Sequence, residues 1–425
     1  MAGVPLGYST LDGSGAVKIL MLTREYPPHV YGGAGVVVDH LTRALAGRAT
    51  VEVRCFGEAD RDEPALRVRG YAPWERLAGT AEARHAPALQ ALSVNLAMAC
   101  DPVVADVVHS HTWYVALGGL LVRALFDIPL VVTLHSLEPL RPWKEEQLGP
   151  GYALSSWAER GAVEQAERVI AVSAGMREDV LAHFSVDAER VRVIHNGVDA
   201  TAFRRTDRRE ALAHHGVRPP YVLFVGRISE QKGIFHLLEA ATRLPVEVQL
   251  VLCAATPDTA ELESRLRTAV AGHPRVRWVN AMLPREELVQ LYSHAAVFVC
   301  PSVYEPFGLI NLEAMACAAP VVATRVGGIR EVVVHDETGW LVPPADPVAL
   351  ATAVNAVLGD PGRAAAFGRA GRRRVEEHFS WARIAGLTLG VYQEAIEAHR
   401  SRSARYQPTP QGGSSGTPGA PRPSA

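Results

Sequence analysis

Two series of short apolar runs, separated by helical patterns, constrain the fold of this chain most strongly. The runs cover residues 17–22, 51–56, 107–111, 129–135, 168–173 and 191–196 in the first half, and residues 221–226, 248–253, 276–280, 296–301 and 320–324 in the second. Each run is apolar at several consecutive positions, which is typical of parallel strands buried on both faces. Helical patterns lie between them, as at residues 36–48, 174–184 and 284–293, so the sequence predicts βαβ units and an α/β fold.

The series restarts after residue 200, which predicts two domains. A charged segment, residues 199–220, ends in a double proline and suits a hinge. We expect two doubly wound, Rossmann-like domains, residues 17–200 and 201–380, that face each other across a cleft. Ligands in such sheets bind beyond the carboxyl ends of the strands, so the cleft is the expected active site.

The ends and the overall composition exclude several classes of protein. Residues 1–16 are small and polar, and residues 400–425 are rich in Pro, Gly and Ser, so both are predicted to be disordered. A formal net charge of −2 gives no general attraction to nucleic acid or anionic lipid. Neither a secretory signal nor an apolar run of ~20 residues is visible, and the five cysteines form no C-x-x-C pair. We expect a cytoplasmic protein without a membrane span; a homodimer is compatible with these features.

A glycine-rich stretch, "YGGAGV", follows the first strand after a long turn and opens a helix. Glycines at such a place let backbone N–H groups and the helix N-terminus approach an anion closely. The spacing lacks the G-x-G-x-x-G pattern, which argues against NAD. The residues alone leave a plain turn open as the alternative.

Two cations follow the first strand of the second half. Arg227 and Lys232 lie five residues apart on the predicted turn, where they can hold a diphosphate. Solvated surface charge is the alternative.

The stretch "PSVYEPFGLINLEAMAC", residues 301–317, places two glutamates eight residues apart. Pro306 favours a helix start near residues 307–309, which leaves Glu305 in the loop before the helix. Glu313 lies within an otherwise apolar helix and needs a partner, such as the hydroxyls of a ribose. A partly exposed helix charge is the alternative.

Two further stretches end strands of the first half. His135 precedes Glu138, Arg141, Trp143 and Lys144, a set that can receive an anionic or sugar-like second ligand, although a structural histidine is the alternative. In "HSHTWY", residues 109–114, the two aromatic rings can stack on a sugar. The H-x-H pattern has no acidic or cysteine ligand close in sequence, so no metal site is predicted.

Three ordered motifs carry a family resemblance: "GR…KG" at residues 226–233, "PS..EPFGL..LEAMAC" at 301–317 and "VVAT.VGG..EVV" at 321–333. They resemble the retaining glycosyltransferases of family 4, which have the GT-B fold. The resemblance covers about residues 17–399. In the first half, "MLTREYPPHVYGGAGV", "VVHSHTWY" and "HSLEPLRPWKEEQLGPGY" are similar to actinobacterial members whose substrates are ADP-glucose and glucose 1-phosphate.

The resemblance implies a role for each candidate residue and no cofactor. The implied catalytic residues are His135, Arg227, Lys232 and Glu305. The implied donor contacts are the Gly32 and Gly33 backbone to the distal phosphate, Arg227 and Lys232 to the diphosphate, Glu313 to the ribose, Glu305 with the backbone at Phe307, Gly308 and Leu309 to the glucose, and His135 near its C6. The implied acceptor contacts are Trp113, Tyr114, Glu138, Arg141 and Lys144, with Arg141 and Lys144 as phosphate ligands. A final helix, residues 381–399, is implied to cross back onto the first domain and complete it.

Three departures from the family pattern stand out. Members that elongate long glucans have a Lys-Thr-Gly-Gly motif where this chain has Val30 and Tyr31 before the glycines, and His-x-His-Asp-Trp where it has Thr112. Both differences favour a small acceptor. Ala318 stands where the family usually has glycine, and we expect a packing difference without loss of activity.

The resemblance implies a retaining glucosyltransferase that uses ADP-glucose, or alternatively UDP-glucose, and forms α-maltose 1-phosphate from glucose 1-phosphate, in α-glucan biosynthesis. Elongation of glycogen ends, transfer of another sugar to inositol phosphate or lipid, a GT-B phosphorylase and a non-catalytic sugar-nucleotide-binding protein are the alternatives. A phosphorylase needs pyridoxal phosphate, whose absorbance discriminates it.

Overall fold

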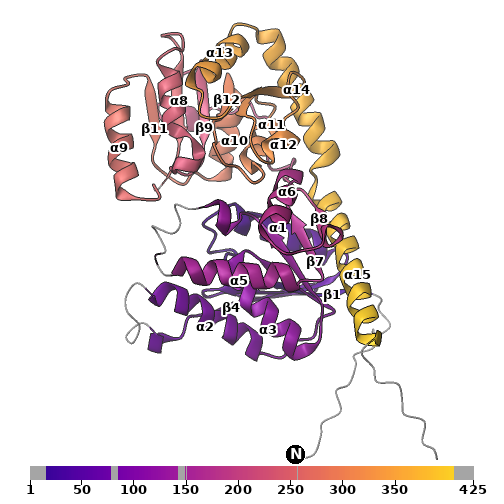
Figure 1. Cartoon of the computed structure of the whole chain (residues 1–425). Coiled ribbons are helices and arrows are strands. Elements are labelled where there is room, and N and C mark those ends of the chain that lie inside the picture. The colour runs from indigo at the N-terminus through magenta and orange to yellow at the C-terminus, as the bar shows by residue number, and fades with distance from the viewer. Residues whose placement is uncertain (1–15, 78–84, 142–148, 150, 256, 406–425) are drawn as a thin grey trace, which may run out of the picture.

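The computed structural model describes residues 16–77, 85–141, 149, 151–255 and 257–405. The chain forms two α/β domains that lie one above the other, and the last helix, α15 (Trp381–Arg405), runs down the side of the first domain (Figure 1). Residues 1–15 and 406–425, and with them most of the predicted disordered ends, lie outside the described residues.

Over the described residues the first domain contains an eight-stranded sheet with the order β3-β4-β2-β1-β5-β6-β7-β8. All neighbouring pairs are parallel except β3 and β4, which form an antiparallel hairpin at the edge. The strands are β1 Lys18–Leu22, β2 Thr50–Phe56, β3 Asp60–Glu63, β4 Leu66–Tyr71, β5 Val107–His111, β6 Leu130–Leu134, β7 Arg168–Ala171 and β8 Val191–Val193.

The second domain contains a sheet that is parallel throughout. Its six strands, as far as the structure describes the chain, have the order β11-β10-β9-β12-β13-β14. They are β9 Tyr221–Val225, β10 Gln249–Cys253, β11 Val276–Val279, β12 Val297–Cys300, β13 Val321–Thr324 and β14 Gly339–Val342.

Helices lie on both sides of each sheet (Figure 1). In the first domain they are α1 Gly33–Ala46, α2 Ala86–Cys100, α3 Ala116–Phe126, α5 Gly151–Gln165 and α6 Ala174–His183. The helices that follow are α7 Glu210–His214, α8 Ile234–Ala241, α9 Ala260–Ala271, α10 Arg285–His294, α11 Leu309–Ala316, α12 Ile329–Val332, α13 Pro347–Leu358 and α14 Pro361–His378. The helices predicted at residues 36–48, 174–184 and 284–293 correspond to α1, α6 and α10.

Strand β1 shows why the runs are apolar at consecutive positions. Ile19 and Met21 point into the core formed with α1 and α15, whereas Leu20 and Leu22 point into the core formed with α2, α3 and α5. All four side chains are buried. Because both faces of the strand are covered, every position needs an apolar side chain.

Each predicted apolar run coincides with a strand, but β3, β4 and β14 were not predicted. Strand β3 is "DRDE" at the sheet edge and carries no apolar residue. Strand β4, "LRVRGY", alternates Leu66 and Val68 with arginines, because only one of its faces is fully covered. Strand β14 is a short edge strand that starts with a glycine.

Helix α15 packs on α1 and on β5, β6 and β7 of the first sheet. It continues to Arg405, so the predicted start of a disordered tail at residue 400 was too early; "SRSAR" is compatible with a helix. The domain bounds at residues 200 and 380 stay predictions. None of the helices in the described part of the chain is long and apolar enough to cross a membrane.

Polar contacts between the domains fix the loop that carries Glu305. Ser173 Oγ donates a hydrogen bond of 2.8 Å to the Pro306 carbonyl. Glu331 accepts hydrogen bonds from the Ala174 and Gly175 amides at the start of α6 and lies 2.8 Å from His195 Nε2. The first turn of a first-domain helix is thus bound to the second domain, beside the residues predicted to bind the donor sugar.

Candidate active site

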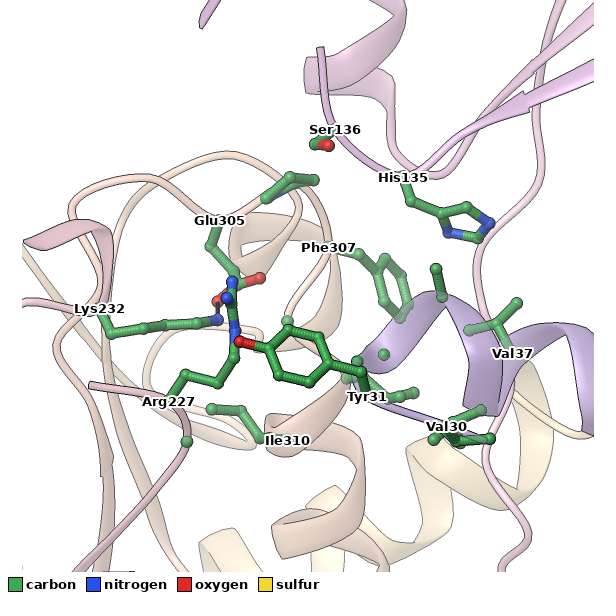
Figure 2. Close-up of a pocket in the computed structure, with 18 of the residues that line it drawn as sticks. Val30, Tyr31, Val37, His135, Ser136, Arg227, Lys232, Glu305, Phe307 and Ile310 are labelled. Carbon is green, nitrogen blue, oxygen red and sulfur yellow. Dashed lines mark hydrogen bonds and ion pairs between the residues drawn. The ribbon is translucent and has the colours of Figure 1, made fainter. Parts of the chain in front are cut away.

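A cavity of about 500 Å³ lies between the two domains. Its walls come from the loops after β1, β5 and β6 in the first domain and after β9, β10 and β12 in the second. All of these are carboxyl ends of parallel strands. In Figure 2, Arg227, Lys232 and Glu305 line one side, while Tyr31 and His135 approach from the first domain. The cavity therefore coincides with the expected cleft.

The glycine loop is held by a carboxylate that the sequence reasoning missed. Glu25 accepts hydrogen bonds from the Tyr31 amide at 2.9 Å and the Gly32 amide at 2.6 Å. A Cβ on Gly35 would lie only 2.7 Å from the Glu25 Cβ, so a side chain at that position would push Glu25 away. The glycines let the start of α1 approach Glu25, and Gly32 and Gly33 line the cavity beside it.

The two predicted cations each have an acidic partner. Lys232 Nζ lies 2.5 Å from Glu305 Oε2, and Arg227 Nη1 lies 3.1 Å from Asp258 Oδ1. The Lys232–Glu305 pair is mostly buried, with side-chain exposures of 14% and 9%. The Arg227 guanidinium also lies 5.9 Å from the centre of the Tyr31 ring, which reaches across from the first domain (Figure 2).

The loop after β12 places Glu305 before the helix, as predicted. Helix α11 begins at Leu309, and Gly308 precedes it with a φ of 99°, a backbone conformation that glycine adopts without strain. Ser302 Oγ donates a hydrogen bond of 3.2 Å to Glu305 Oε2. Phe307, Gly308 and Leu309 line the cavity, so the start of α11 faces it.

Glu313 has a partner within the protein. Its Oε2 accepts a hydrogen bond of 3.0 Å from the Tyr292 hydroxyl, and burial raises the pKa of Glu313 to about 7. Glu313 also lines the cavity. It is therefore available for a further hydrogen bond to a ligand and titrates near neutral pH.

His135 belongs to a cluster of three histidines whose charged forms are disfavoured by burial. Burial lowers the pKa of His135 to about 4, that of His109 to about 3 and that of His111 well below the usual value. His109 is held by Tyr392 of α15 and by Thr133, both at 2.7 Å. These rings are neutral at pH 7, so His135 can offer a ligand hydrogen bonds but no charge.

The contact between His111 and His135 determines which ring nitrogen is the donor. His111 Nδ1 lies 2.9 Å from His135 Nε2, and His111 Nε2 is buried with no hydrogen-bond partner among the described residues. A proton on that Nε2 would be an unsatisfied buried donor, which costs about 1–3 kcal/mol. The proton of His111 therefore sits on Nδ1 and is donated to His135, whose own proton is then on Nδ1.

The predicted acceptor residues divide into those that reach the cavity and those that do not. Tyr114 and Arg141 line it. Trp113 is buried beneath Tyr114, with the ring centres 4.0 Å apart, and does not line the cavity. Glu138 is also buried and does not line it; its carboxylate binds Ser155 at 2.8 Å and Arg141 at 3.5 Å, so it positions the arginine instead. Lys144 lies outside the described residues.

The structure thus brings most of the predicted residues to one cavity: Gly32, Gly33, Tyr114, His135, Arg141, Arg227, Lys232, Glu305, Phe307, Gly308, Leu309 and Glu313. It adds polar residues that were not predicted to line the site: Arg24, Glu25, Tyr31, Thr112, Ser136, Asn196, Gln231 and Tyr304. Arg24 and Glu25 lie two and three residues beyond the end of the first strand. The rule that identified Arg227 at the end of β9 applies to them equally and could have found them.

Comparisons with known proteins agree with this architecture. A family model described as Glycosyltransferase Family 4 matches residues 31–202, and one described as Glycosyl transferases group 1 matches residues 205–374. The alpha-maltose-1-phosphate synthase of Mycolicibacterium smegmatis is 48% identical over 394 residues, which cover 89% of this chain and 99% of that protein. The chain belongs to glycosyltransferase family 4. It is therefore a hexosyltransferase, as the motifs predicted.

The chain is also similar to a glycogen synthase and to a solved structure of a sucrose-phosphate synthase. The glycogen synthase of Mycobacterium tuberculosis is 32% identical over 421 residues, 92% of this chain and 97% of that protein. The structure of sucrose-phosphate synthase from Thermosynechococcus elongatus superposes with a TM-score of 0.74 at 28% identity, over 90% of this chain and 100% of that one. The two Rossmann-like domains thus form a GT-B fold, and the predicted fold class is confirmed.

Proposed function

We propose that this family 4 glycosyltransferase transfers glucose from ADP-glucose to glucose 1-phosphate with retention of configuration, so that α-maltose 1-phosphate is formed. The observation that carries the proposal is a cavity with cations and a glutamate on one wall and a neutral histidine and arginines on the other. The high identity to an alpha-maltose-1-phosphate synthase over nearly its full length supports the choice of acceptor.

The donor is assigned to the second-domain wall. Arg227 and Lys232 bind the diphosphate, and Glu313 binds the ribose through the carboxylate oxygen that Tyr292 leaves free. The Lys232–Glu305 ion pair aligns the cation that meets the phosphate with the carboxylate that holds the glucose hydroxyls. A donor phosphate at the glycine loop meets the Gly33 amide, or replaces Glu25 at the Gly32 amide.

Stabilisation of the leaving group lowers the activation barrier of the transfer. Cleavage of the glycosidic bond gives an oxocarbenium-like sugar and a nucleoside diphosphate, on which negative charge accumulates. Arg227 and Lys232, already fixed by Asp258 and Glu305, need little rearrangement to stabilise that charge. The acceptor hydroxyl attacks from the face that the diphosphate leaves, and its proton passes to the departing phosphate.

His135 positions the transferred glucose. Because its pKa is lowered to about 4, the ring is a neutral hydrogen-bonding group beside the sugar at neutral pH. The His111 contact fixes its tautomer, with Nε2 as the acceptor and Nδ1 as the donor. A cationic ring next to the oxocarbenium-like sugar would oppose the reaction, so the low pKa suits this place.

The test measures the rate of nucleoside diphosphate release. Each donor, ADP-glucose or UDP-glucose, is combined with each acceptor, glucose 1-phosphate or glycogen, in parallel assays. The proposal predicts rapid release with glucose 1-phosphate, a preference for ADP-glucose and slow release with glycogen. Release with glycogen alone would replace it by glucan elongation. The expected cytoplasmic location and a homodimer stay predictions.

A further inference from the structure

Arg24 lies two residues beyond the end of β1, on the first-domain wall of the cavity. Strand β1 is the neighbour of β5, which is the neighbour of β6, so the segments after three adjacent strands lie side by side on this wall. The end of β5 contributes Thr112 and Tyr114, and the end of β6 contributes His135 and Ser136. Arg24 is thus in the same row as the residue assigned to the donor sugar, and no role follows for it from the family motifs.

The charge on Arg24 is not neutralised within the described chain. Among the cations that line the cavity, Arg227, Lys232 and Arg141 each have a carboxylate partner within 3.5 Å. Arg24 has none among the described residues. The neighbouring carboxylate of Glu25 is directed to the amides of the glycine loop instead. Arg24 is therefore the one cation lining the cavity that has no carboxylate partner within the described chain.

The guanidinium of Arg24 is ordered by aromatic stacking. It lies 4.0 Å from the centre of the Tyr114 ring, and Tyr114 stacks in turn on the buried ring of Trp113. Stacking uses the flat face of the guanidinium and leaves its N–H donors free at the edge. Such an arrangement suits a planar, multidentate contact with an anion better than a freely moving surface arginine does.

Neighbouring polar groups on the same wall also lack partners. Thr112 Oγ1 and Arg141 Nε are buried without a hydrogen-bond partner among the described residues. Thr112 has a φ of 68°, which is unfavourable for a β-branched residue, and such strain is frequent at binding sites. Ser136 Oγ accepts a hydrogen bond of 3.1 Å from Arg141 Nη1. Hydroxyl and guanidinium donors beside an unpaired arginine are the groups that bind a phosphate monoester.

We infer that Arg24 binds the phosphate group of the acceptor and, with Arg141, selects a sugar phosphate over an uncharged sugar. The inference rests on the proposed function. The phosphate is on C1 of the acceptor, whereas the attacking hydroxyl is on C4 at the opposite end of the ring. Arg24 therefore contributes to acceptor binding and specificity and does not touch the reacting atoms.

The experiment compares Arg24→Ala and Arg24→Lys with the wild-type protein, using steady-state kinetics for ADP-glucose and for glucose 1-phosphate separately. Loss of a charged hydrogen-bonding partner predicts a rise of about 10- to 100-fold in the KM for glucose 1-phosphate in Arg24→Ala. The KM for ADP-glucose and kcat should change little. Arg24→Lys keeps the charge without the planar fork and should give an intermediate KM.

Arg48→Ala is the matched control, because Arg48 lies just beyond the other end of α1, has no carboxylate partner in the described chain and does not line the cavity. It should leave both KM values unchanged. An unchanged KM for glucose 1-phosphate in Arg24→Ala overturns the inference, and a rise confined to ADP-glucose overturns it by placing Arg24 in the donor site. A wild-type protein that does not use glucose 1-phosphate at all overturns the proposed function and the inference together, and this result is visible before any variant is made.

Discussion

Replacement of Lys232 separates the catalytic role of the Lys232–Glu305 pair from its structural role. Lys232→Met removes the cation and keeps much of the side-chain volume. If Lys232 stabilises the charge on the leaving diphosphate, kcat should fall on the order of 10²–10³-fold. The KM for ADP-glucose should change less, because the charge develops only in the transition state.

The same change leaves Glu305 without its cation in a mostly buried place, where its side chain is 9% exposed. Loss of one partner of a buried pair costs about 3–5 kcal/mol of folding free energy. Lys232→Met should therefore also be less stable to urea. Combining it with Glu305→Gln removes the uncompensated charge and should restore much of the stability, but turnover should stay at least as low as in Lys232→Met.

Activity is measured as nucleoside diphosphate release per folded protein, and stability by urea unfolding followed by circular dichroism. Asp258→Asn is the control: it removes the partner of a cavity cation, Arg227, without removing the cation, and should lower kcat far less. The reasoning is refuted if the double variant regains turnover along with stability, since Lys232 would then act only by holding Glu305 in place.

Three further predictions follow from particular residues. Glu313 has a pKa raised to about 7 and should bind the ribose better once it is ionised, so the KM for ADP-glucose should fall as pH rises through 7. Glu313→Gln should abolish this pH dependence. A pH dependence that persists in the variant would contradict the assignment of Glu313 to the ribose. His109, His111 and His135 have pKa values lowered by burial, so between pH 6.5 and about 4 these histidines bind protons in the unfolded chain but not in the folded one. As pH falls through this range, each of the three histidines therefore lowers the free energy of unfolding by about 1.4 kcal/mol per pH unit. Glu159 and Glu313 have pKa values raised to about 8 and 7, so down to pH 4.5 they increase the free energy of unfolding as pH falls. Urea unfolding should therefore show the greatest stability between about pH 6 and 7. A stability that rises steadily from pH 6.5 to pH 5 would be inconsistent with neutral buried histidines. Ala318 stands where the family usually has glycine, and with a φ of 56° it occupies the left-handed position of a Schellman motif after α11. Ala318→Gly should therefore raise the free energy of unfolding, measured by urea titration, by about 0.5–1 kcal/mol. An unchanged free energy of unfolding would mean that Ala318 is not strained.

The fold was predictable because it depends on one local signal, repeated many times. Strands buried on both faces require consecutive apolar residues, and the predicted runs coincide with strands. Strands such as β3, which lies at an edge and is entirely polar, carry no such signal and were missed. The helix start after Pro306 followed from the backbone restriction of proline alone.

The candidate site was predictable wherever a residue follows a strand or belongs to a family motif. Sequence alone could not distinguish residues that line a cavity from residues that support them. Glu138 and Trp113 lie within two residues of cavity residues in the chain, yet neither lines the cavity: Glu138 holds Arg141, and Trp113 supports Tyr114. The contacts of Glu25 with the glycine loop and of His111 with His135 depend on how distant loops meet, which local patterns do not encode.

Identification of the product tests the central claim most directly. The protein is incubated with ADP-glucose, glucose 1-phosphate and glycogen together, and the small-molecule fraction is analysed by ¹H and ³¹P NMR and by mass spectrometry. The account predicts a phosphorylated disaccharide with an α linkage and the C1 phosphate of the acceptor intact. Growth of glycogen without this product, or a β linkage in it, would contradict the account.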